Sequence, residues 1–557
     1  MRFTRTEDPR RAKLQRKVTN FMQRREFLAK SLAAASVGLA PRTSRAISNQ
    51  VEVLLDEPIG LIRPELHGHF TEHIGGVIYD GIWVGEDSKI PNIGGIRKQL
   101  VDNLRKLNAP VVRWPGGCFA DSYNWHDGIG PRSKRPCRTN FWINDSFLQK
   151  APDGPQKFDP NAFGTDEFMR FCRLISAQPY VAVNLRGLTA ADFDQWVEYC
   201  NAPQGSTTLA DLRAANGSPQ PYGVRYWGIG NEAWGCGGNF TPEEYATEYR
   251  RFAAWVPEYG VKLCFIGSGP SGADFEWTRG FLTGLVAKGK SELNGLYGWA
   301  LHYYCGTAGK GQAIDFTVND WYDLLRKADR MESLIERHWS VMGEVDTEHR
   351  VRLVVDEWGA WHNAGTEVDR AFLFGQTPTL RDALISALTL DTFHRQADKL
   401  AMANVAQLIN NLHCLFLAHE DRFVVTPNFH VFEMYKAHQG GQSVRLVALA
   451  PPIAFQQGET TAAMWGLAGS ASLHDRRLVL TLVNPHVKEA QPAEIVVRGA
   501  SVRSCKVRTL SSPDIHAFNS FDNPHAVMPE DETLTVRQSL IWTFRPASVT
   551  CLEMELA

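Results

Sequence analysis

The chain has 557 residues, enough for two or three domains, and its 44% hydrophobic and 22% charged residues are the mix of an ordinary globular protein. Its 59 Lys and Arg residues nearly balance 61 Asp and Glu residues, for a formal net charge of −2. This balance argues against a broad nucleic-acid or anionic-membrane surface, and the sequence has no apolar run of the ~18 residues that span a bilayer.

Residues 1–46 differ from the rest of the chain. The basic segment QRREFLAK (23–30) is followed by a weakly apolar stretch, 31–40, and then by small residues around Ser44 and Ala46. This pattern resembles a bacterial twin-arginine signal, and the alternative is a disordered basic tail. We therefore expect residues 1–46 to direct export to the periplasm or the cell exterior, and we exclude them from the fold.

The residues from 47 to 438 predict one strand and then a regular alternation of strands and helices. VEVLL (51–55) alternates as a half-buried strand does, within an N-terminal segment 47–64. Further strands are expected at 66–70, 110–114, 180–184, 224–230, 262–267, 298–303, 352–356 and 402–409. Helices between them are expected at 96–107, 163–176, 192–200, from 242 onward, and at 380–395. These eight strand–helix steps predict an α/β fold, a (β/α)₈ TIM barrel over residues 65–438.

The pattern of the sequence changes after residue 438. Short β-branched segments bounded by turns, such as 477–483, 494–497 and 548–553, predict a C-terminal β-sandwich over residues 439–557. The strand at 47–64 is expected to join it.

Two of the expected barrel strands end on a glutamate flanked by tryptophan. They are YWGIGNE, which ends at Glu232, and LVVDEW, which contains Glu357. Taken alone, Glu232 fits a helix cap and Glu357 a solvated loop acid. Together, at the ends of the fourth and seventh strands, where β/α barrels carry their active sites, they predict the paired carboxylates of a glycoside hydrolase.

The cysteines predict no metal site. The ten of them show no CxxC pair and no zinc-type spacing with histidine, so most are expected to be small buried apolar residues. No cofactor is indicated.

Five segments in one order resemble the signatures of glycoside hydrolase family 51, whose members are mainly α-L-arabinofuranosidases. They are FTEHIGG (70–76), RWPGGCFAD (113–121), WGIGNEAWGCGG (227–238), LHYY (301–304) and DEWG (356–359). The resemblance runs from about residue 50 to the C-terminus. It implies a barrel with a jelly-roll sandwich, a retaining exo-acting enzyme on arabinose-containing poly- or oligosaccharides, and a homo-oligomer, often a hexamer.

The resemblance also implies the roles of individual residues. Glu232 corresponds to the general acid/base and Glu357 to the nucleophile of a double displacement. Residues expected to contact the sugar or support the catalytic pair are Glu72, Arg113, Cys118, Asn231, His302, Tyr304 and Gln407. Cys118 stands where some members carry an asparagine, and a thiol is a weaker hydrogen-bonding group.

Two other functions stay open. A barrel hydrolase of different specificity, such as an endo-glucanase or a xylosidase, would use the same carboxylates. A non-catalytic carbohydrate-binding protein on this scaffold is the third interpretation, and the presence of both carboxylates with their supporting residues argues against it.

Overall fold

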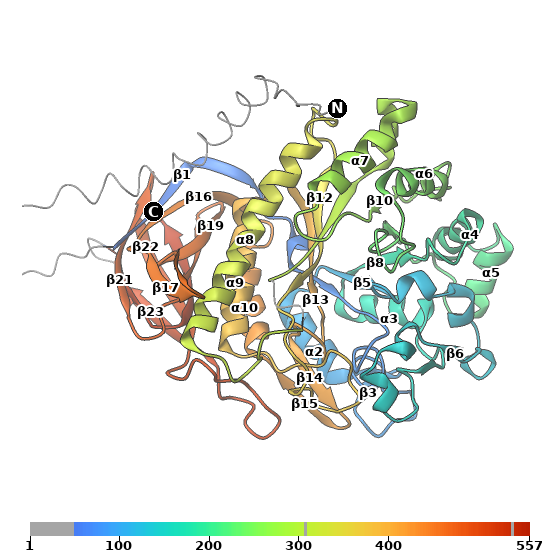
Figure 1. Ribbon diagram of the computed structural model, residues 1–557, viewed down its shortest axis with the longest axis horizontal. Coiled ribbons are helices and arrows are strands. Elements are labelled where there is room, and N and C mark those ends of the chain that lie inside the picture. The colour runs from blue at the N-terminus through green and yellow to red at the C-terminus, as the bar shows by residue number, and fades with distance from the viewer. Residues whose placement is uncertain (1–48, 306–308, 536–539) are drawn as a thin grey trace, which may run out of the picture. The chain divides into compact units, whose positions relative to one another are not determined.

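Eight parallel strands close into a barrel, in which each strand pairs with the next and β13 pairs back to β2 (Figure 1). The computed structural model describes residues 49–305, 309–535 and 540–557, so the expected signal at 1–46 lies outside the described residues. The barrel strands are β2 (Gly68–Phe70), β5 (Val111–Trp114), β8 (Gln178–Val183), β9 (Tyr226–Ile229), β10 (Cys264–Gly267), β11 (Gly298–Tyr304), β12 (Arg352–Gly359) and β13 (Leu400–Ala406). The predicted TIM barrel is confirmed.

Local sequence signals set the helix ends. Thr241 accepts a hydrogen bond from the backbone N–H of Glu244, whose carboxylate accepts one from the N–H of Thr241, and Pro242 occupies the first helical position. The helices are α2 (Lys98–Leu107), α3 (Thr165–Ile175), α4 (Ala190–Asn201), α5 (Thr208–Ala215), α6 (Pro242–Ala253), α7 (Phe275–Leu285), α8 (Val318–Met342), α9 (Leu380–Arg395) and α10 (Pro427–Tyr435).

Several elements begin about two residues later than the sequence predicts, and for two of them the structure shows the cause. The strand expected from residue 66 begins at Gly68, because Pro64–His67 form a 3₁₀ turn that starts at a proline. The helix expected from residue 96 begins at Lys98, because β4 (Ile96–Arg97) pairs with β3 (Asn92–Ile93) in a short hairpin. Other short hairpins are β6 (Arg138–Thr139) with β7 (Phe158–Asp159), β14 (Phe416–His419) with β15 (Arg422–Val425), and β17 (Ile453–Gln457) with β18 (Thr460–Met464).

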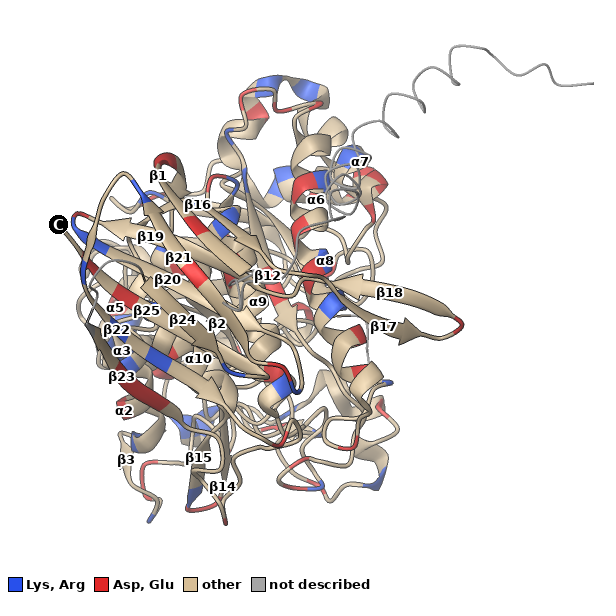
Figure 2. Cartoon of the chain, turned by 90° about the vertical axis from the view of Figure 1, so that its left-hand side faces the viewer, with Lys and Arg blue, Asp and Glu red and all other residues tan. Residues whose placement is uncertain are grey.

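Apart from the barrel, the chain forms a nine-stranded sheet, built mainly from its C-terminal part (Figure 2). Its strands, in spatial order, are β23 (Pro529–Thr535), β22 (Val502–Ser511), β25 (Ser548–Leu556), β20 (Arg477–Asn484), β19 (Ala468–His474), β16 (Gln442–Leu449), β1 (Asn49–Leu61), β21 (Gln491–Arg498) and β24 (Leu540–Phe544). The predicted C-terminal sandwich is confirmed. β1 pairs antiparallel with β16 and parallel with β21, so the N-terminal strand lies inside this sheet.

Strand β20 is buried on both faces, which explains its nearly continuous apolar sequence. Leu478, Leu480 and Leu482 belong to the core inside the sandwich, whereas Val479 and Val483 belong to the core shared with the barrel helices. Helix α9 lies at this junction, and its residues from Leu380 to His394 are all buried. The barrel and the sandwich therefore share one core through α9.

A buried polar cluster lies in the same junction. His394 Nε2 is 3.2 Å from His67 Nε2, and His394 Nδ1 is 2.9 Å from Ser470 Oγ. His438 Nδ1 is 2.8 Å from Ser472 Oγ on the sheet. Burial lowers the pKa of His67 to about 4 and holds the pKa values of His394 and His438 well below the ordinary value, so all three imidazoles are neutral at pH 7.

No helix among the described residues combines the length and apolar character needed to cross a membrane.

Candidate active site

Glu357 lies near the C-terminal end of β12, buried and surrounded by donors. Arg113 Nη1 donates to its Oε1 at 2.9 Å, and the Tyr304 hydroxyl donates to its Oε2 at 2.8 Å. His302 Nδ1 lies 3.5 Å from Oε2. Burial by itself raises the pKa of Glu357, but the charges of His302 and Arg113 outweigh burial and hold that pKa below its ordinary value. The structure thus keeps Glu357 ionised, as a nucleophile must be.

A bulge in β12 turns two consecutive acids toward the site. Leu301 of β11 pairs with Val355, but the next residue, His302, pairs with Glu357, so Asp356 is the extra residue. Asp356 then reaches Arg113, with 3.5 Å between Oδ2 and Nε. Asp356 was assigned no role from the sequence, and since strand residues normally alternate in direction, only the bulge lets both acids face the site.

Two further residues hold Asp356 and were not predicted. The Tyr180 hydroxyl donates to its Oδ2 at 2.7 Å, and Asn404 Nδ2 donates to its Oδ1 at 3.1 Å. Both come from the buried barrel interior, on β8 and β13, where nothing in the sequence distinguishes them from packing residues. By holding Asp356, these two residues also help to fix Arg113, which Asp356 contacts.

Glu232 lies just past the end of β9, in the left-handed region at φ +39°. Its Oε1 is 3.0 Å from His302 Nδ1, and its side chain is 20% exposed, compared with 7% for Glu357. The loop is wound tightly around it, because its carbonyl accepts bonds from the N–H groups of Gly235 and Gly237. The more open setting of Glu232 suits a residue that must meet a leaving group and then a water molecule.

His302 links the two carboxylates. One ligand-type atom from each of Glu232, His302 and Glu357 lies within 4.8 Å of the others. The two carboxylates are therefore close neighbours, with the imidazole of His302 in contact with both. On β11, His302 and Tyr304 both face the site, while Tyr303 turns outward and its hydroxyl donates to the Lys327 carbonyl.

Asn231 and Arg113 are joined directly. Arg113 Nη2 donates to Asn231 Oδ1 at 2.6 Å, and the Asn231 backbone N–H donates to Asp121 Oδ2 at 3.0 Å. The Asp121 carboxylate also accepts bonds from the N–H groups of Leu185 and Arg186. Asp121 therefore ties three loops together at the mouth of the barrel, a role that the sequence did not reveal.

Glu72 and Gln407 form a separate hydrogen-bonded pair near Glu357. Glu72 Oε1 accepts from the Phe119 N–H at 2.9 Å, and Oε2 accepts from Gln407 Nε2 at 3.1 Å. Burial, reinforced by the charge of Glu357, raises the pKa of Glu72 to about 8, against the opposing effect of these bonds. Among the described residues, Gln407 Oε1 has no hydrogen-bond partner. This oxygen can therefore accept a hydrogen bond from a bound molecule.

The loop after β5 approaches both acids through two glycines. A Cβ at Gly116 would lie 2.6 Å from Glu72 Cγ, and one at Gly117 would lie 2.9 Å from Glu357 Oε1. Only a backbone without side chains fits there.

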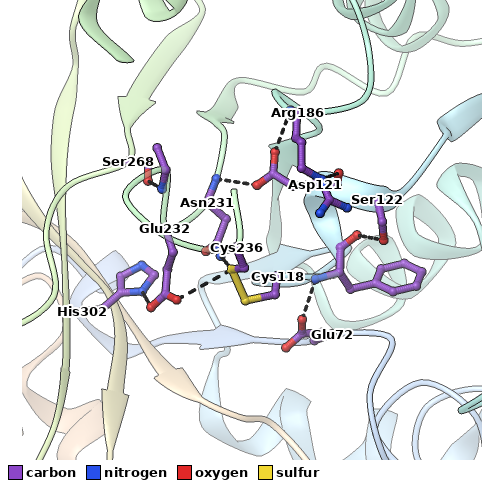
Figure 3. Close-up of a disulfide and its surroundings, with 12 residues drawn as sticks. Glu72, Cys118, Asp121, Ser122, Arg186, Asn231, Glu232, Cys236, Ser268 and His302 are labelled. Carbon is purple, nitrogen blue, oxygen red and sulfur yellow. Dashed lines mark hydrogen bonds and ion pairs between the residues drawn. A yellow bond between two sulfur atoms is a disulfide. The ribbon is translucent and has the colours of Figure 1, made fainter. Parts of the chain in front are cut away.

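Cys118 is not the free thiol that the sequence suggested. It forms a disulfide with Cys236, 118 residues away in the chain, with 5.5 Å between the two Cα atoms (Figure 3). The pairing was missed because the two cysteines lie in different motifs, at the ends of the second and fourth barrel strands. The other eight cysteines are free, and of these Cys137 is exposed and the rest are buried.

Two groups in the site bring metal-binding atom types together. They are Cys118, Glu232 and Cys236, and Glu232, His302 and Glu357. In the first group the two sulfur atoms are bonded to each other, and in the second the carboxylates already bind Arg113, Tyr304 and His302. These contacts account for both groups without an ion.

Comparison with known proteins gives one consistent family. Two family models match, the α-L-arabinofuranosidase 1 domain over residues 103–283 and the α-L-arabinofuranosidase C-terminal domain over residues 356–548. A relative from Bacteroides ovatus, named an intracellular exo-α-L-arabinofuranosidase, is 35% identical over 91% of this chain and 95% of its own length.

Two solved structures are also similar. The GH51 arabinofuranosidase from Xanthomonas axonopodis pv. citri has a TM-score of 0.83 and 33% identity over 91% of this chain and all of its own. An α-L-arabinofuranosidase from Thermotoga maritima, in complex with arabinose, has a TM-score of 0.79 and 28% identity over the same shares.

The comparison corrects one expectation. The Bacteroides ovatus relative is named an intracellular enzyme, which contradicts the predicted export to the periplasm or the cell exterior. An arginine pair ahead of a weakly apolar stretch is a short pattern, and a basic N-terminal tail of similar composition produces it equally well. The twin-arginine interpretation of residues 1–46 is therefore withdrawn.

Proposed function

The chain belongs to the α-L-arabinofuranosidases of glycoside hydrolase family 51, and we propose that it is a retaining, exo-acting enzyme that releases terminal arabinofuranosyl residues from arabinan, arabinoxylan or their oligosaccharides. The proposal rests on one observation, that two carboxylates lie close together in different surroundings. Glu357 is buried and held ionised, while Glu232 is partly exposed and shares His302 with it.

The roles follow from these settings. Glu357 attacks the anomeric carbon while Glu232 protonates the leaving oxygen, which gives a covalent glycosyl-enzyme. Glu232 then takes a proton from water, and the water oxygen displaces Glu357. Retention follows from two successive inversions at one carbon.

The remaining residues divide into two groups. Arg113, Tyr304 and His302 hold the nucleophile in place and ionised, because each contacts its carboxylate. Glu72, Asn231 and Gln407 offer polar atoms beside it, which we assign to the hydroxyl groups of the arabinofuranosyl unit. We assign catalysis to the barrel, residues 65–438, and a supporting role to the sandwich formed by 47–64 and 439–557.

The first test measures hydrolysis of 4-nitrophenyl α-L-arabinofuranoside by the purified full chain. Glu357→Ala should abolish turnover, while Glu348→Ala, at a residue whose side chain is 76% exposed, should leave the rate unchanged. Proton NMR of the first-formed sugar should show the α-anomer. The β-anomer would refute the retaining mechanism, and turnover by Glu357→Ala would refute the nucleophile.

Specificity and assembly need their own measurements. Initial rates on 4-nitrophenyl β-D-xyloside and on soluble glucan should be far below the rate on the arabinofuranoside, and the reverse order would favour a xylosidase or an endo-glucanase. Family resemblance predicts a homo-oligomer, often a hexamer. Light scattering after size exclusion would give the mass directly, and a monomer of 62.4 kDa would contradict that prediction.

A further inference from the structure

The Cys118–Cys236 disulfide joins two loops of the active site. The loop with Cys118 lies beside Glu72 and Glu357, and the loop with Cys236 carries Glu232. Cys118 follows β5, and Cys236 follows β9, with β8 between these strands in the barrel. The bond therefore bridges loops that are not neighbours in the sheet. Figure 3 shows it between the side chains of Glu232 and Glu72.

On the β5 side, the bond is anchored to the nucleophile and to the sugar-facing acid. The Cα of Gly117 lies so close to Glu357 that a Cβ there would be 2.9 Å from Oε1. On the other side of Cys118, the Phe119 N–H binds Glu72 at 2.9 Å. Cys118 is thus held in place by its two neighbours, each of which contacts an acid of the site.

On the β9 side, the bond reaches the acid/base itself. Cys236 Sγ lies 3.8 Å from Glu232 Oε2 and 3.8 Å from Asn231 Nδ2. Glu232 occupies the left-handed backbone region at φ +39°, which costs a residue with a side chain free energy because its Cβ crowds the following carbonyl oxygen. A conformation of that cost persists only where the surrounding structure holds it, and the disulfide closes the loop on which it occurs.

We propose that the Cys118–Cys236 disulfide is a positioning element for Glu232, and that its reduction selectively impairs acid/base catalysis. This inference rests on the proposed function of Glu232. Both cysteines are partly exposed, so a small dithiol can reach the bond. One thiolate of the dithiol attacks a sulfur atom to form a mixed disulfide, its second thiol displaces the enzyme sulfur, and two protein thiols and one oxidised dithiol result.

Once reduced, the loop keeps its backbone bonds, the bonds of Asn231 to Arg113 and Asp121, and the contact of Glu232 with His302, but it loses its covalent link to the loop after β5. Glu232 then samples other orientations, while Glu357 keeps Arg113, Tyr304 and His302. The effect should therefore fall on steps that need proton transfer and spare those that do not. A disulfide that merely stabilised the fold would affect all substrates alike.

The experiment compares two leaving groups in one enzyme. The value of kcat/KM is measured for 4-nitrophenyl α-L-arabinofuranoside, whose leaving group needs little protonation, and for an α-linked arabinobiose, whose leaving group needs it. General acid catalysis contributes about 10²–10⁴-fold, so reduction with dithiothreitol should lower kcat/KM about tenfold or more on arabinobiose and less than about twofold on the aryl substrate. Reoxidation should restore the original ratio.

The variants separate position from redox chemistry. Cys118→Ser/Cys236→Ser should behave as the reduced parent does, with or without dithiothreitol, and Cys137→Ser should respond as the parent does, because Cys137 is the exposed free cysteine. Azide, which attacks the glycosyl-enzyme without a general base, should raise the aryl kcat of the reduced enzyme but not of the oxidised one. Peptide mapping without reductant reports the state of the bond, and reversible reduction of the parent serves if the double variant fails to fold.

The outcomes are distinct. Equal losses on both substrates, or no loss on either, would overturn the positioning role. An oxidised parent that is inactive on every arabinofuranoside would instead overturn the proposed function.

Discussion

Arg113 and Glu357, 244 residues apart in the chain, form a buried ion pair with 2.9 Å between Nη1 and Oε1. The guanidinium also packs over the ring of Phe70 at 4.6 Å. The cation is thus fixed by an aromatic face below it and by carboxylates at its edge. The low pKa of Glu357 depends on this side chain, on His302 and on the hydrogen bond from Tyr304.

Replacing Arg113 by Met should raise the pH at which the enzyme becomes active. Without the cation, burial dominates and the pKa of Glu357 rises, and a neighbouring Arg typically shifts a carboxyl pKa by about 1–3 units. Since the nucleophile must be ionised, the acid limb of the kcat/KM profile should move to higher pH by about that amount. Arg138→Met, at a 60% exposed side chain, is the control. An unmoved acid limb in Arg113→Met would show that His302 and Tyr304 keep Glu357 ionised without Arg113.

Gly117→Ala should cost most of the activity without unfolding the protein. The added methyl group would lie 2.9 Å from Glu357 Oε1, so either the carboxylate or the loop has to shift. A displacement of this kind costs about 10²-fold in kcat. Gly154→Ala, where an added Cβ meets nothing within 4 Å, should keep the parental rate. Full activity in Gly117→Ala would mean that the loop adjusts freely.

Glu72→Gln should stabilise the protein at alkaline pH. The folded-state pKa of Glu72, about 8, is above its unfolded value, so its contribution to stability is complete below pH 4.5 and is lost as pH rises toward 8. Glutamine stays neutral and can still accept from the Phe119 N–H, and Gln407 can turn its unpartnered Oε1 toward the new amide. The difference in melting temperature between variant and parent should therefore grow from pH 5 to pH 8. A constant difference would show that Glu72 is ionised throughout.

The histidine cluster between barrel and sandwich should make the fold acid-sensitive. The folded-state pKa values of His67, His394 and His438 are below the unfolded value, so their contribution is present above pH 6.5 and is lost as pH falls toward 4. Asp391 in the same cluster has a pKa raised to about 6 and opposes this trend, but it is one group against three.

Urea unfolding at pH 7 and pH 5 measures this effect. His438→Gln, which keeps a neutral polar group beside Ser472 and Thr481, should reduce the pH dependence by up to about 1.4 kcal/mol per pH unit. His525→Gln, at an exposed residue, should not change it. Equal pH dependence in all three proteins would place the acid sensitivity elsewhere.

Most of the fold could be predicted from the hydrophobic periodicity of the sequence. The eight barrel strands and helix α9 lie where the sequence predicted them, because long periodic segments and capping signals such as Thr241 are local properties. The starts expected at residues 66 and 96 moved because a 3₁₀ turn begins at Pro64 and residues 92–97 form a short hairpin, two local features that hydrophobic periodicity does not report.

The site was predictable only in part, for a related reason. Glu232 and Glu357 stand out because acids at the ends of apolar strands contradict simple burial. Asp356 faces the site only because of a bulge, and Cys236 meets Cys118 only when the barrel closes. Neither relationship leaves a local mark in the chain.

The position of β1 has a consequence for synthesis. Among the described strands this one is synthesised first, yet its partner β16 begins roughly 380 residues later and β21 later still. At about 5–20 residues per second, β1 waits on the order of 20–80 s without a partner while the barrel forms behind it. During that interval its unpaired edges are open to other chains, and they are covered only when β16 and β21 have been made.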